Sequence, residues 1–296
     1  MLRVSDSDAR MPPVSRAAND ASAPPRPAML QRARGEGRIE VDRPTPGGHR
    51  ILGLRQSGAA KIMCPRNHAD EAFEAVLLNT AGGLAGGDRL RWEASAGRDS
   101  ELRVTTQAAE RVYRSNSGDA LIETRLCADA GATLEWLPQE TILFDGSRLS
   151  RTLSIELAED ADLLAVEAIV FGRRAHGERV RSGSLRDHWR VRRNGRLIYA
   201  DSIRMDGAIA ALLDRPANFG GAQSFATLLM AGPHVLPIDD LRAILPSGDG
   251  LQAGASMLPH VTVVRIIAAH GDLLRPALAR LLRALRGTAL PRVWQA

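Results

Sequence analysis

The side chains that could carry chemistry in this sequence are mainly carboxylates and arginines, and they gather where short apolar segments end. Carboxylates exchange protons or bind cations, and arginine binds carboxylates or phosphates through its forked guanidinium group. Signatures of nucleophilic catalysis are missing: there is no Gly-x-Ser-x-Gly elbow, and no recognisable base accompanies Ser115. The polar residues that stand out are Asp88 with Arg89, Glu110 with Arg111 and Arg114, Gln139 with Glu140, Asp145, Glu167 and Glu178.

Glu167 differs from the others because it interrupts an apolar segment, LLAVEAIVF. A strand with period two places it on one face with Leu163, Ala165, Ile169 and Phe171. An unpaired carboxylate buried on that face would be costly. Two interpretations are therefore open. Glu167 is either buried with a partner or along a wet channel, or it occupies an exposed edge position.

The histidines and cysteines do not form a recognisable metal site. The seven histidines are scattered without the i, i+4 spacing of a helical site, and neither Cys64 nor Cys127 belongs to a Cys-x-x-Cys pair. Cys64 and His68 are close in sequence, but a lone thiol and imidazole in a loop are more often incidental. We therefore expect no disulfide framework, no high-affinity metal cage and no tightly bound cofactor.

Residues 77–90, LLNTAGGLAGGDRL, contain four glycines within six positions. The segment lacks the lysine of a phosphate-binding P-loop, and the following RLRWEASAG alternates like a strand, which also argues against a dinucleotide-binding turn into a helix. Glycine adopts positive φ or lets another chain approach closely. The segment therefore predicts a connection between two strands, the second of which buries Leu90, Trp92 and Ala94.

Charge and composition limit the class of protein. The chain has 296 residues and a formal net charge of +5, with Lys61 as its only lysine. Abundant arginine suits nucleic acid or an acidic protein partner, or it reflects genomic base composition. Aromatic residues amount to only 4% of the chain, which weakens the nucleic-acid interpretation. Since there is no secretory signal and no apolar run of about 18 residues, we expect a cytoplasmic protein that does not enter a membrane.

Many short alternating segments, separated by Gly, Asp or Ser turns, predict an all-β fold of stacked, mostly antiparallel sheets with a few helices. No repeat of constant length stands out, although a solenoid with irregular rungs would not show one. Asn194-Gly195 predicts a two-residue hairpin turn. One side of that hairpin carries a basic ladder, which we interpret as a solvated sheet face, formed by Arg186, His188, Arg190 and Arg192.

Helices and a domain boundary complete the expected organisation. Residues 1–37 are rich in Pro, Ala, Ser and Arg without apolar periodicity, and they predict a disordered and dispensable N-terminal arm ahead of a β-rich domain at 38–296. The longest helix is expected at 271–287, where an amphipathic pattern predicts that it caps a sheet. Asp206 and Asp272 are the expected N-caps of helices at 206–217 and 271–287, and a further short helix is expected at 237–248.

Six segments occur in an order that is specific to one family. They are KIMCPR at 61–66, GGDRL at 86–90, TTQAAERVYRS at 105–115, LEWLPQETILFDGS at 134–147, FGRRAHGE at 171–178 and PRVW at 291–294. Together they make residues 38–296 resemble the UreD (UreH) family of urease accessory proteins. The resemblance implies a non-enzymatic, β-rich scaffold that binds UreF and UreG and docks on apo-urease.

The same resemblance implies that nickel passes from the GTPase UreG through UreF and this protein towards the urease active site. A cation in transit needs oxygen ligands that release it again. We therefore assign a transient nickel path to Asp88, Glu140, Asp145, Glu167 and Glu178. Residues expected to face a partner are Tyr113, Arg114, Ser115, Arg173 and Arg174. An arginine-rich module that binds nucleic acid and an unrecognised hydrolase are the alternatives.

Overall fold

The computed structural model describes residues 32–43, 48–65 and 72–295. Strands hold 52% and helices 13% of the described residues, which confirms the expectation of a β-rich protein with few helices. The predicted domain boundary at residue 37 comes too late, because the first strand already begins at Arg34. Residues 1–31 of the arm predicted at 1–37 lie outside the described residues.

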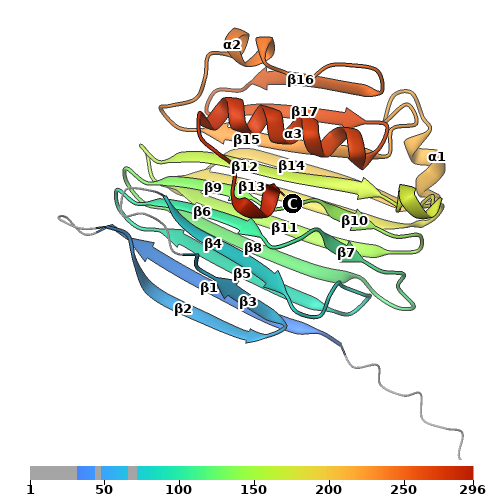
Figure 1. Ribbon diagram of the computed structural model, residues 1–296, viewed down its shortest axis with the longest axis horizontal. Helices are drawn as coiled ribbons and strands as arrows, with labels where there is room; N and C mark the ends of the chain where they lie inside the picture. Colours follow the sequence, from blue (N-terminus) through green and yellow to red (C-terminus); the bar gives the residue numbers. More distant parts are fainter. Residues whose placement is uncertain (1–31, 44–47, 66–71, 296) are drawn as a thin grey trace, which may run out of the picture. The chain divides into compact units, whose positions relative to one another are not determined.

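The first of two sheets has seven strands in the order β14-β13-β11-β8-β5-β1-β2 (Figure 1). Neighbouring strands from β1 to β13 are parallel, while the two edge strands, β2 and β14, pair in antiparallel fashion. The strands are β1 (Arg34–Asp42), β2 (Arg50–Gly58), β5 (Arg89–Ala96), β8 (Ala120–Ala128), β11 (Arg148–Leu157), β13 (Gly183–Arg193) and β14 (Arg196–Gly207).

The second sheet has the order β16-β17-β15-β12-β9-β6-β4-β3, with the short strand β10 beside β12 and β7 beside β10. Its central strands, from β4 to β12, are also parallel. The strands are β3 (Ala60–Met63), β4 (Phe73–Asn79), β6 (Glu101–Thr106), β7 (Glu110–Val112), β9 (Thr133–Leu137), β10 (Thr141–Leu143), β12 (Asp162–Phe171), β15 (Ser224–Ala231), β16 (Leu251–Met257) and β17 (Thr262–Ala268).

The chain passes from one sheet to the other and back, so that β5–β6, β8–β9 and β11–β12 form successive rungs of a solenoid. The prediction of mostly antiparallel sheets was therefore wrong for the centre of both sheets. Each turn carries the chain across to the other layer instead of folding it back beside the strand it has just left. Period-two burial is the same in either case, because it depends only on which face meets the core.

The main core lies between the two sheets, where aligned apolar side chains stack from strand to strand. Leu90, Trp92 and Ala94 of β5 are buried there as predicted. Because the parallel strands are in register, one residue from each strand contributes to a continuous row. One such row across the first sheet consists of Ile39, Ala94, Leu126, Ile155 and Val191.

A second core lies on the other face of the second sheet, beneath helix α3 (Gly271–Arg286). Strand β15 is buried along its whole length because it has the main core on one side and α3 on the other. Leu274, Leu278 and Leu282 of α3 are buried against this sheet. The prediction that an amphipathic C-terminal helix caps a sheet is confirmed (Figure 1).

The helix starts differ from those expected. Asp206 belongs to β14 and not to the start of α1 (Ile209–Leu213), and the N-cap of α3 is His270 with Asp272 in the first turn. In both places the preceding strand fixes where the chain turns into the helix. Helix α2 (Ile238–Ala243) forms where expected. No helix in the described part of the chain is both long and apolar enough to cross a membrane.

The predicted hairpin joins β13 to β14. Asn194 and Gly195 both adopt positive φ, at 47° and 74°, as a type I′ turn requires. The strands on either side pair in antiparallel register. The hairpin turn is confirmed.

The last described residues return to the middle of the chain. The indole N–H of Trp294 donates to the backbone oxygen of Leu137 at 3.0 Å, and the Gln139 side chain donates to the backbone oxygen of Val293 at 2.7 Å. Trp294 is buried in the second core. The closing PRVW segment is thus fastened to β9.

Candidate functional site

The glycine segment carries the chain from β4 in the second sheet to β5 in the first. Asp88, at its end, is buried, and its two carboxylate oxygens accept the amide N–H groups of Ala33, at 2.8 Å, and Ala85, at 2.7 Å. These bonds tie the turn to the start of β1. The Asp88 carboxylate therefore already holds backbone in place.

The glycines are needed because the segment packs directly on the residues after β7. A Cβ on Gly86 would lie 1.8 Å from the hydroxyl oxygen of Ser115, and one on Gly83 would lie 2.4 Å from the ring of Tyr113. The Tyr113 hydroxyl donates to the backbone oxygen of Gly82 at 3.0 Å. Tyr113 and Ser115, both predicted to face a partner, thus lie against the glycine segment.

A cleft of about 890 Å³ contains two of the predicted carboxylates, Asp145 and Glu178. The Asp145 carboxylate accepts the backbone N–H groups of Arg181, at 2.8 Å, and Ser182, at 3.0 Å, and pairs with Arg114 at 3.1 Å. Glu178 lies beside it, because one of its oxygens accepts the Asp145 amide at 3.3 Å. We call this cleft the Asp145 pocket.

Both carboxylates of the Asp145 pocket are held in the ionised form. Partial burial opposes ionisation of Asp145, but the amides of Ser182 and Arg181 and the nearby guanidinium groups outweigh it and lower its pKa. For Glu178, burial is outweighed by the guanidinium of Arg173, 2.7 Å away, and by the Asp145 amide, so its pKa is lowered as well. The pocket therefore presents two fixed negative charges amid arginines.

A second cleft of about 710 Å³ adjoins the first, and we call it the Glu140 pocket. Glu140 pairs there with Arg275 of α3 at 2.9 Å. The two pockets share Tyr113, Phe144 and Arg173. The Arg173 guanidinium stacks 4.2 Å from the centre of the Phe144 ring, and the Tyr113 ring meets Phe144 edge-on at 5.1 Å. This cluster forms the wall between the pockets.

Glu167 lies elsewhere, in the main core. It is 5% exposed, it pairs with Arg151, and it accepts the indole N–H of Trp136 at 3.0 Å. Arg151 also binds both oxygens of Asp187, at 3.1 and 2.6 Å. Burial with a partner is thus confirmed, and the exposed-edge interpretation of Glu167 was wrong. Burial raises the pKa of Glu167 to about 6, although the Arg151 guanidinium opposes the shift.

Sequence reasoning missed both partners of this buried ion-pair network, Arg151 and Asp187. A signal was present, since period two places Arg151 among the inward residues of β11 and Asp187 between Leu185 and Trp189. Each is a charged residue that interrupts an apolar face, as Glu167 does. Three such interruptions, two on neighbouring strands of the first sheet and one on a facing strand of the second, indicate that the side chains pair with one another.

The predicted residues therefore separate into three places. Asp88 and Ser115 lie at the glycine segment, and Glu167 lies in the core. The described residues contain no group of three or more His, Cys, Asp or Glu side chains that could hold one metal ion; His68 lies outside them. The two adjoining pockets bring together Glu140, Asp145, Glu178, Tyr113, Arg114, Arg173 and Arg174.

Comparison with known proteins identifies the family of the chain. The profile of the UreD urease accessory protein family matches residues 33–295. The urease accessory protein UreD of Rhizobium rhizogenes strain K84 is 46% identical over 275 residues, which are 93% of this chain and 98% of that protein. UreD of Methylobacterium sp. strain 4-46 is 45% identical over 93% of this chain and 99% of its own length, and UreD of Rhizobium leguminosarum bv. viciae is 47% identical over 89% and 96%. The chain belongs to the UreD family of urease accessory proteins.

Proposed function

We propose that this protein is a non-enzymatic, cytoplasmic scaffold of urease maturation. It docks on apo-urease together with UreF and UreG, and it offers carboxylate oxygens along part of the route by which nickel reaches the urease active site. Its relatives are named as urease accessory proteins, which supports a role in maturation. Docking with UreF and UreG and the transfer of nickel are what we propose beyond that role.

The observation that carries the proposal is the convergence on the Asp145 and Glu140 pockets. Three of the five residues predicted for metal transfer and four of the five predicted for partner contact come from three separate stretches of sequence, yet they line two clefts with a common wall. Nickel handed from one protein to the next must travel close to an interface. Adjoining pockets with both kinds of residue suit that requirement.

The carboxylates of these pockets suit a cation that moves on. Ni²⁺ accepts oxygen ligands, but tight resident sites use several imidazole or thiolate ligands. Asp145, Glu178 and Glu140 are each already paired with an arginine, so an arriving cation must displace a guanidinium group. This competition keeps the hold on nickel weak. Asp88 and Glu167 remain predicted path residues, although both are occupied by internal bonds.

The shared wall and the arginines beside it in each pocket suit contact with a protein. Tyrosine and arginine are enriched among residues that dominate binding at interfaces. Tyr113 is 36% exposed, and the side chains of Arg114 and Arg174 are 66% and 62% exposed. Their forked guanidinium groups match carboxylates on a partner.

The test separates nickel transfer from assembly. We would measure nickel per urease active site beside a pull-down with UreF and urease, for the double variant Asp145→Asn, Glu178→Gln. The control is Asp239→Asn, which changes an exposed Asp–Arg pair on α2. Less nickel with an unchanged pull-down supports the proposal. Unchanged nickel, or loss of nickel and of complex in parallel, would refute it.

A further inference from the structure

The two sheets end unequally on the side of the later strands. The first sheet stops at β14, whereas the second continues past β15 to β17 and β16. Asp201 of β14 pairs with Arg265 of β17 at 2.6 Å, which places this rim across from β17. The inward positions of β16 carry Gln252, Gly254 and Ser256, and all three are exposed. The second sheet thus has an inner face that the first sheet does not cover.

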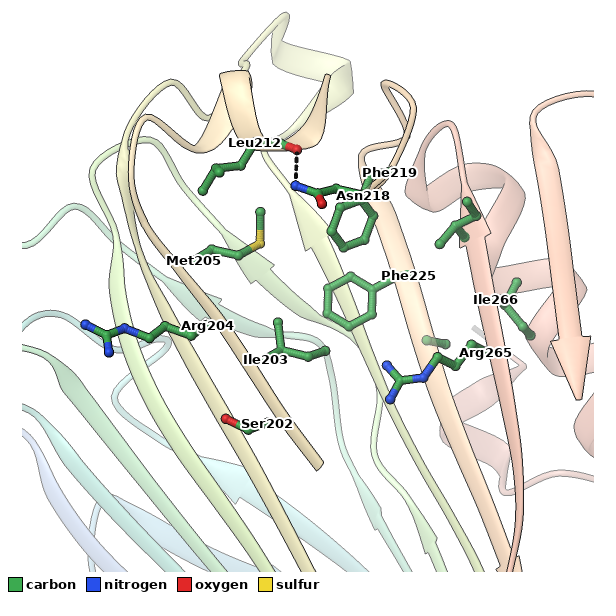
Figure 2. A pocket seen from close by; sticks show the side chains of 12 residues that line it. Ser202, Ile203, Arg204, Met205, Leu212, Asn218, Phe219, Phe225, Arg265 and Ile266 are labelled. Carbon is green, nitrogen blue, oxygen red and sulfur yellow. Dashed lines mark hydrogen bonds between the residues drawn. The ribbon is translucent and has the colours of Figure 1, made fainter. Parts of the chain in front are cut away.

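A groove follows this uncovered strip, and we call it the open-end groove. Its first part, of about 350 Å³, is lined by Ile203 and Met205 of β14, Phe225 of β15 and Phe219 near α1. Figure 2 shows Ile203 and Met205 of the first sheet facing Phe225 of the second, with Phe219 beside Phe225 and Arg204 directed to the other side of its strand. A second part, of about 360 Å³, continues past Arg265.

Polar groups along the groove lack the partners that a finished sheet would give them. The described residues provide no strand that pairs with β14 on the side away from β13. The Ser202 amide donates instead to the side chain of Asp201, at 2.9 Å. The buried hydroxyl of Tyr199 lies near Asp201 and Arg265 but makes no well-formed hydrogen bond to either. Buried polar groups are seldom left this way.

We propose that the open-end groove receives an extended segment of a partner protein, which adds as one further strand to the free edge of β14. Strands in a sheet lie about 4.8 Å apart, so an added strand would lie across from β17 and complete the sandwich. Strand addition gives affinity through backbone hydrogen bonds and specificity through alternate side chains. The proposal rests on the scaffold role above and names the kind of partner segment involved.

The chemistry of both faces defines this segment. Inward side chains would meet Phe225 and Ile267, so they should be apolar and small enough to pass Arg265. Outward side chains would lie beside the basic ladder of β13 and β14. Arg186 of that ladder has an acidic partner, Asp119, but in the described residues Arg190 and Arg204 have none. The segment should therefore alternate apolar with acidic residues.

A second copy of this chain fits the groove poorly. If two β14 strands met edge to edge with the sheets facing the same way, the overhanging β15, β17 and β16 of both copies would occupy the same space. If the second copy were turned over, its arginine-bearing outer face would lie on the apolar groove. A separate partner avoids both conflicts.

The experiment uses the full chain in cells that also make urease and its other accessory proteins. A photo-crosslinking phenylalanine derivative replaces Ser256, and the crosslinked peptide is identified by mass spectrometry. Ser202→Pro removes one amide on the free edge of β14. Ser202→Ala is its control, because both variants lose the bond between the Ser202 hydroxyl and His188 of the β13 ladder but only the proline variant loses the amide. Arg204→Glu reverses the charge beside the groove, with Arg55→Glu at the opposite edge of the same sheet as its control.

We expect a crosslink to a segment that alternates apolar and acidic residues, reduced about tenfold by Ser202→Pro and by Arg204→Glu but not by either control. The proposal would be overturned if no crosslink formed or if the crosslink yield were equal in all variants. It would also be overturned by a crosslink to a helical or basic segment, to this chain itself or to lipid. Urease nickel content with and without the unmodified chain is measured in the same cells. Failure of the scaffold role would appear there, whatever the crosslink result.

Discussion

Arg151 on β11 and Glu167 on β12 form an ion pair across the interior between the two sheets. Both side chains are almost fully buried, and Asp187 completes the network from the neighbouring strand β13. Removing one member of such a network leaves uncompensated charge in the core. Retaining all members satisfies the donors and acceptors but does not by itself favour the folded state.

Arg151→Met should therefore lower the free energy of unfolding by about 3–5 kcal/mol, because two buried carboxylates lose their cation. Glu167→Gln should cost less, since the amide still accepts the Trp136 indole. Urea unfolding at low protein concentration measures both. Arg38→Met, which breaks an exposed pair with Glu40, should change stability little. Equal small effects at both arginines would show that the buried network is dispensable.

Stability should fall as pH rises from about 4.5 to 7, in part because of Glu110. Burial raises the pKa of this carboxyl to about 7, against the opposing hydrogen bond from Asn79. At pH values between the ordinary pKa of 4.5 and the folded-state pKa of about 7, the native state binds the Glu110 proton more strongly than the unfolded state does. This contribution to the free energy of unfolding is therefore fully present at low pH and is lost as the pH rises past 7. We expect a loss of about 1–2 kcal/mol.

Urea unfolding at pH 5 and pH 8 measures that loss. Glu110→Gln should flatten the slope, whereas Glu123→Gln, on an exposed position of β8, should leave it intact. A slope that survives Glu110→Gln unchanged would assign the pH dependence to another group. Glu167 is the first candidate, because burial shifts its pKa in the same direction.

Asp88→Ala and Glu178→Ala should behave differently, although both residues were predicted for the nickel path. Asp88→Ala leaves two amides without acceptors and should cost about 2–3 kcal/mol, so complex and nickel should fall together. Glu178→Ala removes a carboxylate at an open pocket and should lower nickel while the complex persists. Unfolding, pull-down with urease and nickel content give the three readings. A stable Asp88→Ala variant with low nickel would restore Asp88 to the path.

The edge strand β2 should limit solubility when the chain is produced without partners. Leu52 and Leu54 are 57% and 44% exposed, and they lie on a sheet edge at which the described residues place no further strand. Replacing both with lysine should increase the soluble fraction about twofold or more. Ile244→Lys, at an exposed apolar position outside the sheets, is the control. Equal gains from both changes would point to net charge and not to the edge.

How far the sequence predicts this fold depends on the range of each signal. The Asn194-Gly195 turn, the apolar stripe of α3 and the inward face of β5 are local patterns, and the structure has all of them. The parallel order of the strands was missed because alternation is identical in both pairings. Helix starts at Ala208 and His270 depend on where a preceding strand ends.

The candidate site shows the same division. Residue types and motif positions singled out Asp145, Glu178 and Tyr113, but their meeting in adjoining pockets depends on which rungs stack. The pairing of Arg151 with Glu167 and Asp187 likewise joins three strands that sequence alone does not place side by side. The distances between such residues depend on the order in which the strands stack. Local sequence patterns predict that order least well.

The fastening of the PRVW segment to β9 has a consequence for how the protein is made. Solenoid rungs contact mainly their neighbours, so the early rungs can form in order while the ribosome is still at work. The bond from Trp294 to Leu137 spans 157 residues, and it cannot form until residue 294 has been translated. A prematurely ended chain keeps its early rungs but exposes the apolar strip under the missing tail. The second core is therefore completed only when residues 291–294 have been made, and chains that stop before them carry the exposed surface that cellular proteases and chaperones act on.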